Sequence, residues 1–271
     1  MAEDAVVVAM ANQKGGVGKS TCTICAARAA NRYHGARVLV VDMDPQGNVT
    51  NTLARDPLAA DEVTLADAIT PDSGVALREV LVPTIWEGVD LAPGGSALSI
   101  ADNKLSASDY GREFGLREAL APVRADYDLV IIDNPPSLLG QLLKNSLTAA
   151  DAVVLVTEAD EWSGDGLALL GKTIAKVRTY HNQQLQIIGT IMNKWRETTS
   201  GRTAAAEIIE GMARHFPGVP VWIDNKIPLW VGIPDAIKAG IALDQSKDTR
   251  LRILSEDVFS PIAAHMLKAA A

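Results

Sequence analysis

A glycine- and lysine-rich stretch near the N-terminus contains the residues best suited to chemistry. Residues 12–20 read NQKGGVGKS and follow the apolar run 5–11. Because glycine has no Cβ, backbone N–H groups in such a stretch can turn inward around a phosphate. Lys19 adds a positive charge for the phosphate, and Ser20 adds a hydroxyl ligand for magnesium. The glycines of this predicted phosphate-binding loop are Gly15, Gly16 and Gly18.

The loop departs from the usual phosphate-loop pattern, GxxxxGK[ST], at its first position. The pattern requires a glycine five residues before Gly18, and this chain has Gln13 there. The chain also carries a second lysine, Lys14, at the start of the loop. Its position alone is compatible with an ordinary hydrated loop lysine, so Lys14 needs a further observation before it has a role.

Three aspartates at predicted strand ends are candidates for holding magnesium and water. ATP hydrolysis needs a magnesium ion on the β- and γ-phosphates and a water in line with the γ-phosphorus. Asp133 follows the apolar residues 129–132, a position typical of a magnesium ligand. Asp42 and Asp44 end an earlier strand, and in an extended chain their carboxylates face the same side. The alternative role of all three is to cap the turn that follows.

The segments that position these residues alternate between apolar strands and helices. Short valine-rich runs are typical of strands buried on both faces of a parallel sheet. We expect strands at 5–11, 37–42, 89–92, 127–133, 152–157, 186–192 and 219–223, and helices at 21–33, 166–180, 203–215 and 234–242, with another ending near 149. This order predicts an α/β fold with a single doubly wound, mostly parallel sheet flanked by helices.

No linker, internal repeat or low-complexity tract divides the chain, so we expect one domain over residues 1–271. Residues 50–126 are punctuated by five prolines, and no role is predicted for them. From about residue 248, apolar residues recur at helical spacing. Pro261 is expected to divide this last stretch into two helices.

Composition limits the class of protein. The chain of 271 residues has a formal net charge of −8, and no apolar run reaches the roughly 18 residues of a membrane helix. Its N-terminus is acidic where a secretory signal is basic, so we expect a soluble cytoplasmic protein. Cys22 and Cys25 form a C-x-x-C pair that could serve metal or redox chemistry, but no second pair completes a zinc site. We expect them to pack a helix against the sheet.

Three segments together resemble the nucleotide motifs of ParA/Soj-type partition ATPases, in the deviant-Walker class of P-loop proteins. They are KGGVGKS at 14–20, DMDPQGN at 42–48 and IIDNPPS at 131–137, and their order and separation also match. Weaker similarity extends through Asn193 and residues 226–228. The DPQGN and PPS segments favour the partition branch over MinD-like division-site regulators.

The resemblance implies a role for each motif residue. Lys14 would be the signature lysine that reaches across an ATP-sandwich dimer to the phosphates held by the partner subunit. Asp44 would position the attacking water, so the implied catalytic residues are Lys14, Lys19 and Asp44. The implied magnesium ligands are Ser20, Asp133 and, through water, Asp42. The implied nucleotide-binding residues are Gly15, Gly16, Val17, Gly18, Lys19, Ser20, Thr21, Asn193, Ile227 and Pro228, of which the last three would lie around the adenine.

The chain departs from the family pattern at three further places. Ser20 stands where threonine is common, and either hydroxyl can serve as a ligand. Asn134 replaces the small residue or cysteine that often follows the magnesium aspartate. The segment Glu158–Gly164, which reads EADEWSG, is also unusual. The family pattern therefore does not predict which contacts the residues after the strand at 152–157 make.

The implied function is an ATP-dependent switch for plasmid or chromosome segregation that uses ATP and Mg²⁺. The ATP-bound homodimer would bind DNA non-specifically and associate with the nucleoid, and a ParB-like centromere-binding partner would stimulate its weak hydrolysis. A MinD-like membrane-associated regulator is the alternative, but it needs a basic amphipathic C-terminal helix, and the tail SPIAAHMLKAAA has one lysine. A nitrogenase iron-protein role needs cysteines near Asp133, and there are none.

Basic residues are unevenly distributed along this acidic chain. Residues 172–214 carry seven lysines and arginines against three glutamates, which is a net +4 and leaves −12 for the remainder. A local basic face on an acidic protein fits binding to the DNA backbone, although such residues are also common on ordinary hydrated helices. Only about ten residues precede the loop, too few for a helix-turn-helix domain, so we expect no operator recognition. The DNA-binding candidates are Lys238, Lys247, Arg250 and Arg252.

Overall fold

A computed structural model gives the fold of the chain. It describes residues 4–12, 14–59, 62–136, 140–158 and 164–269, without the side chains of 164–168. Gln13, Ser137 and most of the unusual segment 158–164 lie outside the described residues. Among the described residues, no helix is both long enough and apolar enough to cross a membrane.

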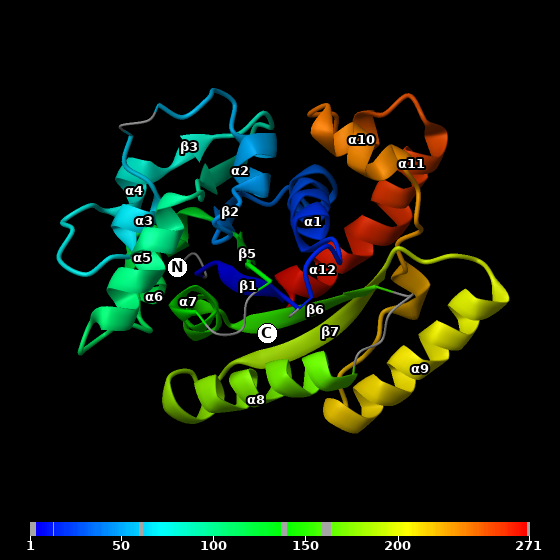
Figure 1. The fold of residues 1–271 in the computed structure, drawn as a ribbon. Coiled ribbons are helices and arrows are strands. Elements are labelled where there is room, and N and C mark those ends of the chain that lie inside the picture. Colours follow the sequence, from blue (N-terminus) through cyan, green and yellow to red (C-terminus); the bar gives the residue numbers. More distant parts are fainter. Residues whose placement is uncertain (1–3, 13, 60–61, 137–139, 159–163, 270–271) are drawn as a thin grey trace.

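One sheet of seven strands forms the centre of the described part of the molecule (Figure 1). Its strand order is β3-β4-β2-β5-β1-β6-β7, and every neighbouring pair is parallel except the short β3–β4 pair. The predicted doubly wound, mostly parallel α/β fold is confirmed. The strands are β1 Val6–Ala11, β2 Val38–Asp42, β3 Val82–Pro83, β4 Val89–Ala92, β5 Leu129–Asp133, β6 Ala152–Glu158 and β7 Gln186–Asn193.

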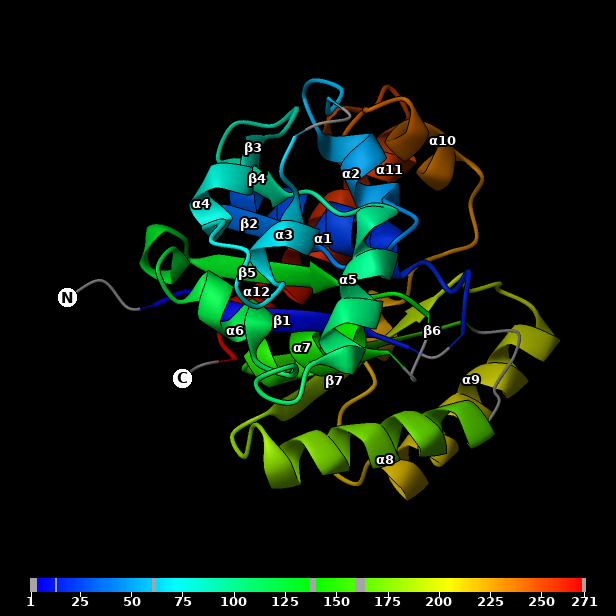
Figure 2. The ribbon, with the colours of Figure 1, turned by 60° about the vertical axis from the view of Figure 1, so that its left-hand side comes forward.

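Helices cover both faces of the sheet (Figures 1 and 2). On one face lie α1, α2 and α10–α12, and on the other lie α3–α9. The first group is α1 Lys19–His34, α2 Asn48–Leu53, α10 Gly232–Lys238, α11 Thr249–Leu254 and α12 Ser260–Leu267. The second group is α3 Leu65–Ala68, α4 Leu77–Val80, α5 Ala97–Ala107, α6 Gly115–Leu120, α7 Gln141–Ala149, α8 Gly164–Tyr180 and α9 Thr199–His215.

The central strand β1 shows why its sequence is apolar throughout. Val6, Val8 and Met10 pack into the core on the α1 face, whereas Val7 and Ala9 pack into the core on the α7 face. All six residues of the strand are buried. A strand covered on both faces cannot alternate apolar with polar residues, so its sequence is a continuous apolar run.

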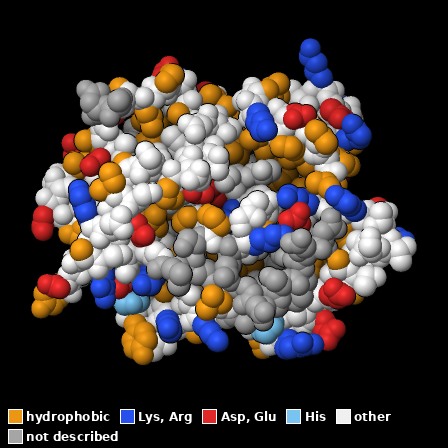
Figure 3. All heavy atoms as spheres, in the orientation of Figure 1, with side chains coloured by type: hydrophobic (Ala, Val, Ile, Leu, Met, Phe, Trp, Pro, Cys, Tyr) orange, Lys and Arg blue, Asp and Glu red, His pale blue; other side chains and the backbone are white. Residues whose placement is uncertain are grey.

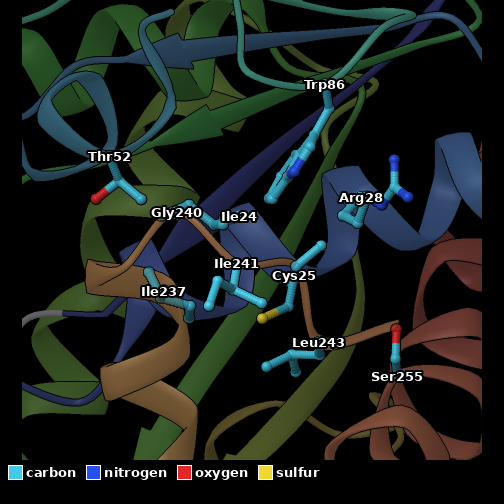
Figure 4. A pocket seen from close by; sticks show the side chains of 11 residues that line it. Ile24, Cys25, Arg28, Thr52, Trp86, Ile237, Gly240, Ile241, Leu243 and Ser255 are labelled. Carbon is cyan, nitrogen blue, oxygen red and sulfur yellow. The ribbon is translucent and has the colours of Figure 1, made fainter. Parts of the chain in front are cut away.

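Helix α1 begins in the glycine loop and packs against the C-terminal part of the chain. Arg28 donates two hydrogen bonds to the carboxylate of Asp244, at 3.0 and 2.7 Å, and lies over the ring of Trp86. Arg28 and Trp86, with further side chains of α1 and of residues 237–243, also line a pocket of about 10 Å³, the space of about one water molecule (Figure 4). The pocket is therefore part of the packing between α1 and this segment.

The cysteine pair has the predicted packing role. Cys22 and Cys25 lie on the buried face of α1, and Cys25 lines the small pocket beside Leu243 (Figure 4). Burial, together with nearby negative charge, raises the pKa of both thiols, so they stay protonated.

Two local predictions in the C-terminal half are wrong. The expected strand at 219–223 is reduced to a single bridge from Val221 to Thr190, and a 3₁₀ turn begins at Ile223. Pro261 does not divide the C-terminal stretch, because the chain passes from α11 through a π-helical turn at Ser255–Phe259 directly into α12. The wider π-helical turn directly before the proline gives room for its ring, which would otherwise meet a carbonyl of the preceding α-helical turn.

Candidate functional site

The carboxyl ends of three adjacent strands bring the motif residues together. Strand β1 lies between β5 and β6 and ends in the glycine loop, and Asp42 of β2 is in register with Asp133 of β5. Met10 of β1 is also in register with Asp133. In open α/β sheets, ligands bind in the crevice outside these strand ends. The structure therefore places the loop and two of the predicted carboxylates at one edge of the sheet.

The glycine loop is supported from outside by a residue of another strand. The side-chain amide of Asn193, at the end of β7, donates to the carbonyl oxygen of Val17 at 2.7 Å. Gly18 has φ +92°, and a Cβ built on it would overlap Nδ2 of Asn193. Gly18 is thus required both by its backbone conformation and by the contact with Asn193. Contact between Asn193 and adenine stays a prediction, and the residue has in addition this structural contact with the loop.

The first residues of α1 contact the carboxylate at the end of β5. Asp133 accepts a hydrogen bond from the Ser20 hydroxyl at 2.7 Å and another from the Thr23 hydroxyl at 3.2 Å. Burial, with the negative charge of Asp42 as a smaller cause, raises the pKa of Asp133 to about 7. A hydroxyl beside a buried carboxylate whose charge is poorly compensated fits the oxygen-donor preference of Mg²⁺. Ser20 and Asp133 are therefore suited to hold this ion.

Lys19 lies close to the same carboxylates. Its side chain is buried, and burial lowers its pKa, although the charges of Asp133 and Asp44 act in the opposite direction. Its ammonium group lies 3.5 Å from the carbonyl oxygen of Lys14, across the loop. A buried lysine that feels the charges of two carboxylates is placed to neutralise additional negative charge, as a bound phosphate would bring.

Asp42 is fully buried and its carboxylate has partners of its own. One oxygen accepts from the backbone N–H and the hydroxyl of Thr50, at 2.8 and 2.7 Å, and the other accepts from the N–H of Asp44 at 3.2 Å. The N–H of Gly94 donates in turn to the Thr50 hydroxyl at 2.9 Å. Asp42 therefore anchors the start of α2, and a magnesium role for it would have to be shared with these contacts.

Thr50 is a residue of this site that the sequence pattern did not reveal. It lies beyond the DPQGN motif, in a polar stretch where nothing distinguishes it from Thr52. The available signal was its position in the first turn of a helix that begins at Asn48, but this helix was not predicted.

Asp44 lies at the same edge and is 7% exposed. One of its carboxylate oxygens accepts from the N–H of Gln46 at 2.9 Å, so it shapes the turn after β2. Asp44 therefore caps the turn, and this contact still leaves acceptor sites on its carboxylate for a functional role.

Lys14 lies at the start of the loop with its ammonium group 3.6 Å from the carboxylate of Glu158, at the end of β6. Its backbone N–H is held by the side chain of Asn12 at 2.9 Å. The Lys14 side chain is 38% exposed, so it is partly accessible to solvent. The loop geometry thus leaves its long side chain at the rim of the site.

The two other adenine candidates differ in exposure. Ile227 is fully buried in the core beside α1, and its carbonyl accepts from the N–H of Trp195 at 2.8 Å. Pro228 lines a groove of about 570 Å³ together with Trp195 and Trp230. Of these two predicted neighbours of the base, the structure places only Pro228 at an open surface.

The four DNA-binding candidates lie on the exposed side of α10, α11 and their connection. Figure 3 shows lysine and arginine side chains in this region, at the upper right, beside hydrophobic ones. Arg250 pairs with Asp248 at 2.7 Å, and Arg252 donates to the carbonyl oxygen of Ser246 at 2.7 Å. These contacts fix the two guanidinium groups in place but use part of their hydrogen-bonding capacity.

The raised pKa values predict a pH dependence of the nucleotide-free protein. Folding raises the pKa of Asp133 from 3.8 to about 7 and, mainly through burial, that of Asp42 to about 6. Between pH 4 and 7 the folded state therefore holds protons that the unfolded chain has released, and this contribution to stability is lost as the pH rises. We expect the melting temperature to fall by several degrees between pH 5 and pH 7.5.

Thermal unfolding of the nucleotide-free protein at several pH values measures this dependence, and Asp133→Asn is the control. Asparagine keeps the shape of the side chain but does not titrate, so the fall with pH should become smaller in this variant. An identical pH profile in both proteins would contradict the assignment to Asp133.

Comparison with known proteins follows the same segments. A family model described as an AAA domain matches residues 5–187. The chromosome-partitioning ATPase Soj of Thermus thermophilus is 34% identical over 268 residues, which cover 94% of this chain and 96% of that protein. An uncharacterised protein of Mycobacterium tuberculosis is 40% identical over 207 residues, or 76% of this chain, and the match spans only 64% of its relative's length.

Solved structures agree with the fold. A structure titled cobyrinic acid a,c-diamide synthase from Mycobacterium smegmatis, with bound ADP and magnesium, has a TM-score of 0.77 at 31% identity and covers 96% of this chain and 93% of its own. The septum site-determining protein MinD of Pyrococcus horikoshii, complexed with Mg-ADP, has a TM-score of 0.72 at 21% identity over 98% of both chains. The second likeness shows a shared fold alone.

Proposed function

The chain belongs to the ParA/Soj family of partition ATPases, and from this premise we propose that it is an ATP-dependent switch for the segregation of DNA. In this proposal residues 1–271 form one ATPase domain. Binding of ATP and Mg²⁺ produces a homodimer that binds DNA without sequence preference and associates with the nucleoid. A ParB-like partner then stimulates a weak intrinsic hydrolysis and releases the protein from DNA.

One observation carries this proposal: the residues needed for phosphoryl transfer meet at a single edge of the sheet. Lys19, Asp44 and Asp133 come from three segments of the chain, and the Ser20 hydroxyl lies 2.7 Å from the Asp133 carboxylate. Phosphoryl transfer requires mainly positioning and charge neutralisation, which is what such a cluster can provide.

Each residue then has a defined task. Ser20 and Asp133 would hold Mg²⁺, and Asp42 would support it through water while it fixes the start of α2. Bound magnesium would neutralise charge on the β- and γ-phosphates. Lys19 contacts the phosphates of its own subunit, whereas Asp44 orients the attacking water and accepts its proton. Lys14 reaches the phosphates bound by the partner subunit, which explains a second lysine in the loop.

The remaining nucleotide contacts come from backbone and strand-end residues. The phosphate groups are bound by N–H groups of Gly15 to Thr21. Asn193 and Pro228 are the proposed neighbours of the adenine. Ile227 supports that region from the core, since its side chain is fully buried.

DNA binding is the property that tests the proposal, and we expect it to require ATP and to weaken steeply with salt. If the side chains of Lys238, Lys247, Arg250 and Arg252 neutralise four phosphates, the logarithm of the affinity falls with the logarithm of the salt concentration with a slope of about −3.6 per subunit. Fluorescence anisotropy with random-sequence duplexes measures this slope with ATP, with ADP and without nucleotide.

The double variant Arg250→Gln, Arg252→Gln should bind DNA more weakly and with a shallower slope. Arg37→Gln is the matched control, because Arg37 is also an exposed, ion-paired arginine but precedes β2, away from α10 and α11. Equal losses in the two proteins would reject the proposed DNA face. Binding to anionic vesicles but not to DNA in the presence of ATP would favour the MinD-like alternative.

A further inference from the structure

The carboxylate of Glu158 lies between two lysines that come from different loops. One oxygen is 3.6 Å from the ammonium group of Lys14, and the other is 3.1 Å from that of Lys194. Glu158 ends β6, Lys14 belongs to the phosphate loop, and Lys194 follows β7. The Glu158 side chain is only 18% exposed, so its charge depends on these cations more than a fully hydrated carboxylate would.

The backbone of Lys194 is held in an unusual conformation that favours this arrangement. Its φ of +55° places it in the left-handed region, which is uncommon for residues other than glycine. It follows Asn193, which is in register with Glu158 on the neighbouring strand and supports the phosphate loop through Val17. Backbone conformations of this kind persist where surrounding contacts hold them. In this conformation the side chain of Lys194 reaches Glu158.

We propose that Glu158 is a positioning residue that holds Lys14 on its own subunit until the ATP-bound dimer forms. This inference rests on the proposed function, in which Lys14 moves to the phosphates of the partner subunit. When Lys14 leaves, Lys194 remains as the cation for Glu158, so the carboxylate is not left without compensation. Glu158 and Lys194 together thus contribute to how readily Lys14 is released, and thereby to how readily the dimer forms.

The size of the effect follows from the exposure of the pair. A partly exposed ion pair such as Lys14–Glu158 shifts an equilibrium by about threefold. Each subunit of the dimer releases one Lys14, so the effect enters twice, and loss of the Glu158 charge should tighten the dimer by about tenfold.

Glu158→Gln tests this inference because it removes the charge and keeps the shape. The dimer dissociation constant is measured by sedimentation equilibrium with magnesium and a non-hydrolysable ATP analogue. We expect the constant to be about tenfold lower for Glu158→Gln than for the parent protein. An unchanged or higher constant would overturn the inference.

A second variant separates positioning from a merely structural ion pair. Lys194→Asn removes the competing cation, and asparagine tolerates the left-handed conformation better than most residues. Glu158 then no longer pairs with Lys194 and holds Lys14 more strongly. The dimer should therefore become weaker than that of the parent, which is the opposite of the effect of Glu158→Gln. If the Glu158–Lys194 pair only supported the fold, both variants would change dimerisation and melting temperature in the same direction.

The parent protein distinguishes this inference from the proposed function. A parent that stays monomeric with the ATP analogue contradicts the ATP-sandwich dimer, and the inference falls with it. A parent that dimerises, combined with variants that do not shift in opposite directions, leaves the proposed function intact and rejects only the role of Glu158.

Discussion

The Asp44→Ala protein is expected to hydrolyse ATP roughly 10²–10⁴-fold more slowly than the parent while still binding ATP, because a positioned base contributes about this much. Asp44 is 7% exposed at the edge where Lys19 and Asp133 lie, so no bulk water readily replaces its carboxylate. With hydrolysis blocked, the ATP-bound dimer should persist. Phosphate release measures the rate, and size-exclusion chromatography with light scattering measures the dimer after ATP addition.

Asp44→Asn separates the chemical role of this residue from its contribution to the turn. Asparagine keeps an oxygen acceptor for the N–H of Gln46, which lies 2.9 Å from the carboxylate in this structure, but it cannot take a proton from water. Both variants should therefore be slow, and Asp44→Asn should retain the thermal stability of the parent. Hydrolysis near the parent rate in Asp44→Asn would show that Asp44 only shapes the turn.

Gly18→Ala is expected to abolish nucleotide binding and to lower the free energy of unfolding by about 2–5 kcal/mol. A left-handed conformation costs a residue with a Cβ about 1–2 kcal/mol, and displacing packed neighbours adds about 1–3 kcal/mol. Gly18 has φ +92°, and the added Cβ would overlap the amide of Asn193. The movement that relieves this overlap breaks the hydrogen bond from Asn193 to Val17, so the loop loses its outer support.

Gly15→Ala is the matched control for stability within the same loop. Its φ does not lie in the left-handed region, and the nearest atom to an added Cβ is Cβ of Pro136 at 3.8 Å, an ordinary contact. The melting temperature of nucleotide-free Gly15→Ala should therefore stay close to that of the parent, while that of Gly18→Ala falls. Equal melting temperatures for Gly18→Ala and the parent would contradict the role given to this contact. Nucleotide binding is measured by isothermal titration.

The position of the site could be predicted because each strand is a continuous apolar run, so the polar residue that follows it marks where the strand ends. Asp42 and Asp133 each follow a run of buried residues, and the parallel sheet places the two in register. The contacts around them were not predictable. Thr50 reaches Asp42 through a short helix of six residues, and Asn193 reaches Val17 across a separation of 176 residues. Neither contact leaves a periodic or local pattern in the sequence.

The fold was predictable for the same reason, and its failures have local causes. Residues 219–223 have the apolar character of a strand, but they form only a single bridge to β7, in which the backbones of Pro220 and Trp222 hydrogen-bond to Thr190. Pro261 is a helix breaker by composition, yet the π-helical turn directly before it accommodates its ring. Between residues 50 and 126, α3 and α4 have four residues each, too short for a helical period to be recognised.

The ion pair between Arg28 and Asp244 connects α1 to the C-terminal part of the chain. With 16 residues, this helix is about 24 Å long and starts at the phosphate loop. Partway along it, two hydrogen bonds of 3.0 and 2.7 Å fasten it to Asp244, only a few residues before Lys247, Arg250 and Arg252. Because α1 and residues 243–254 pack on the same face of the sheet, this ion pair connects the helix that starts at the phosphate loop directly to the segment that carries the basic side chains.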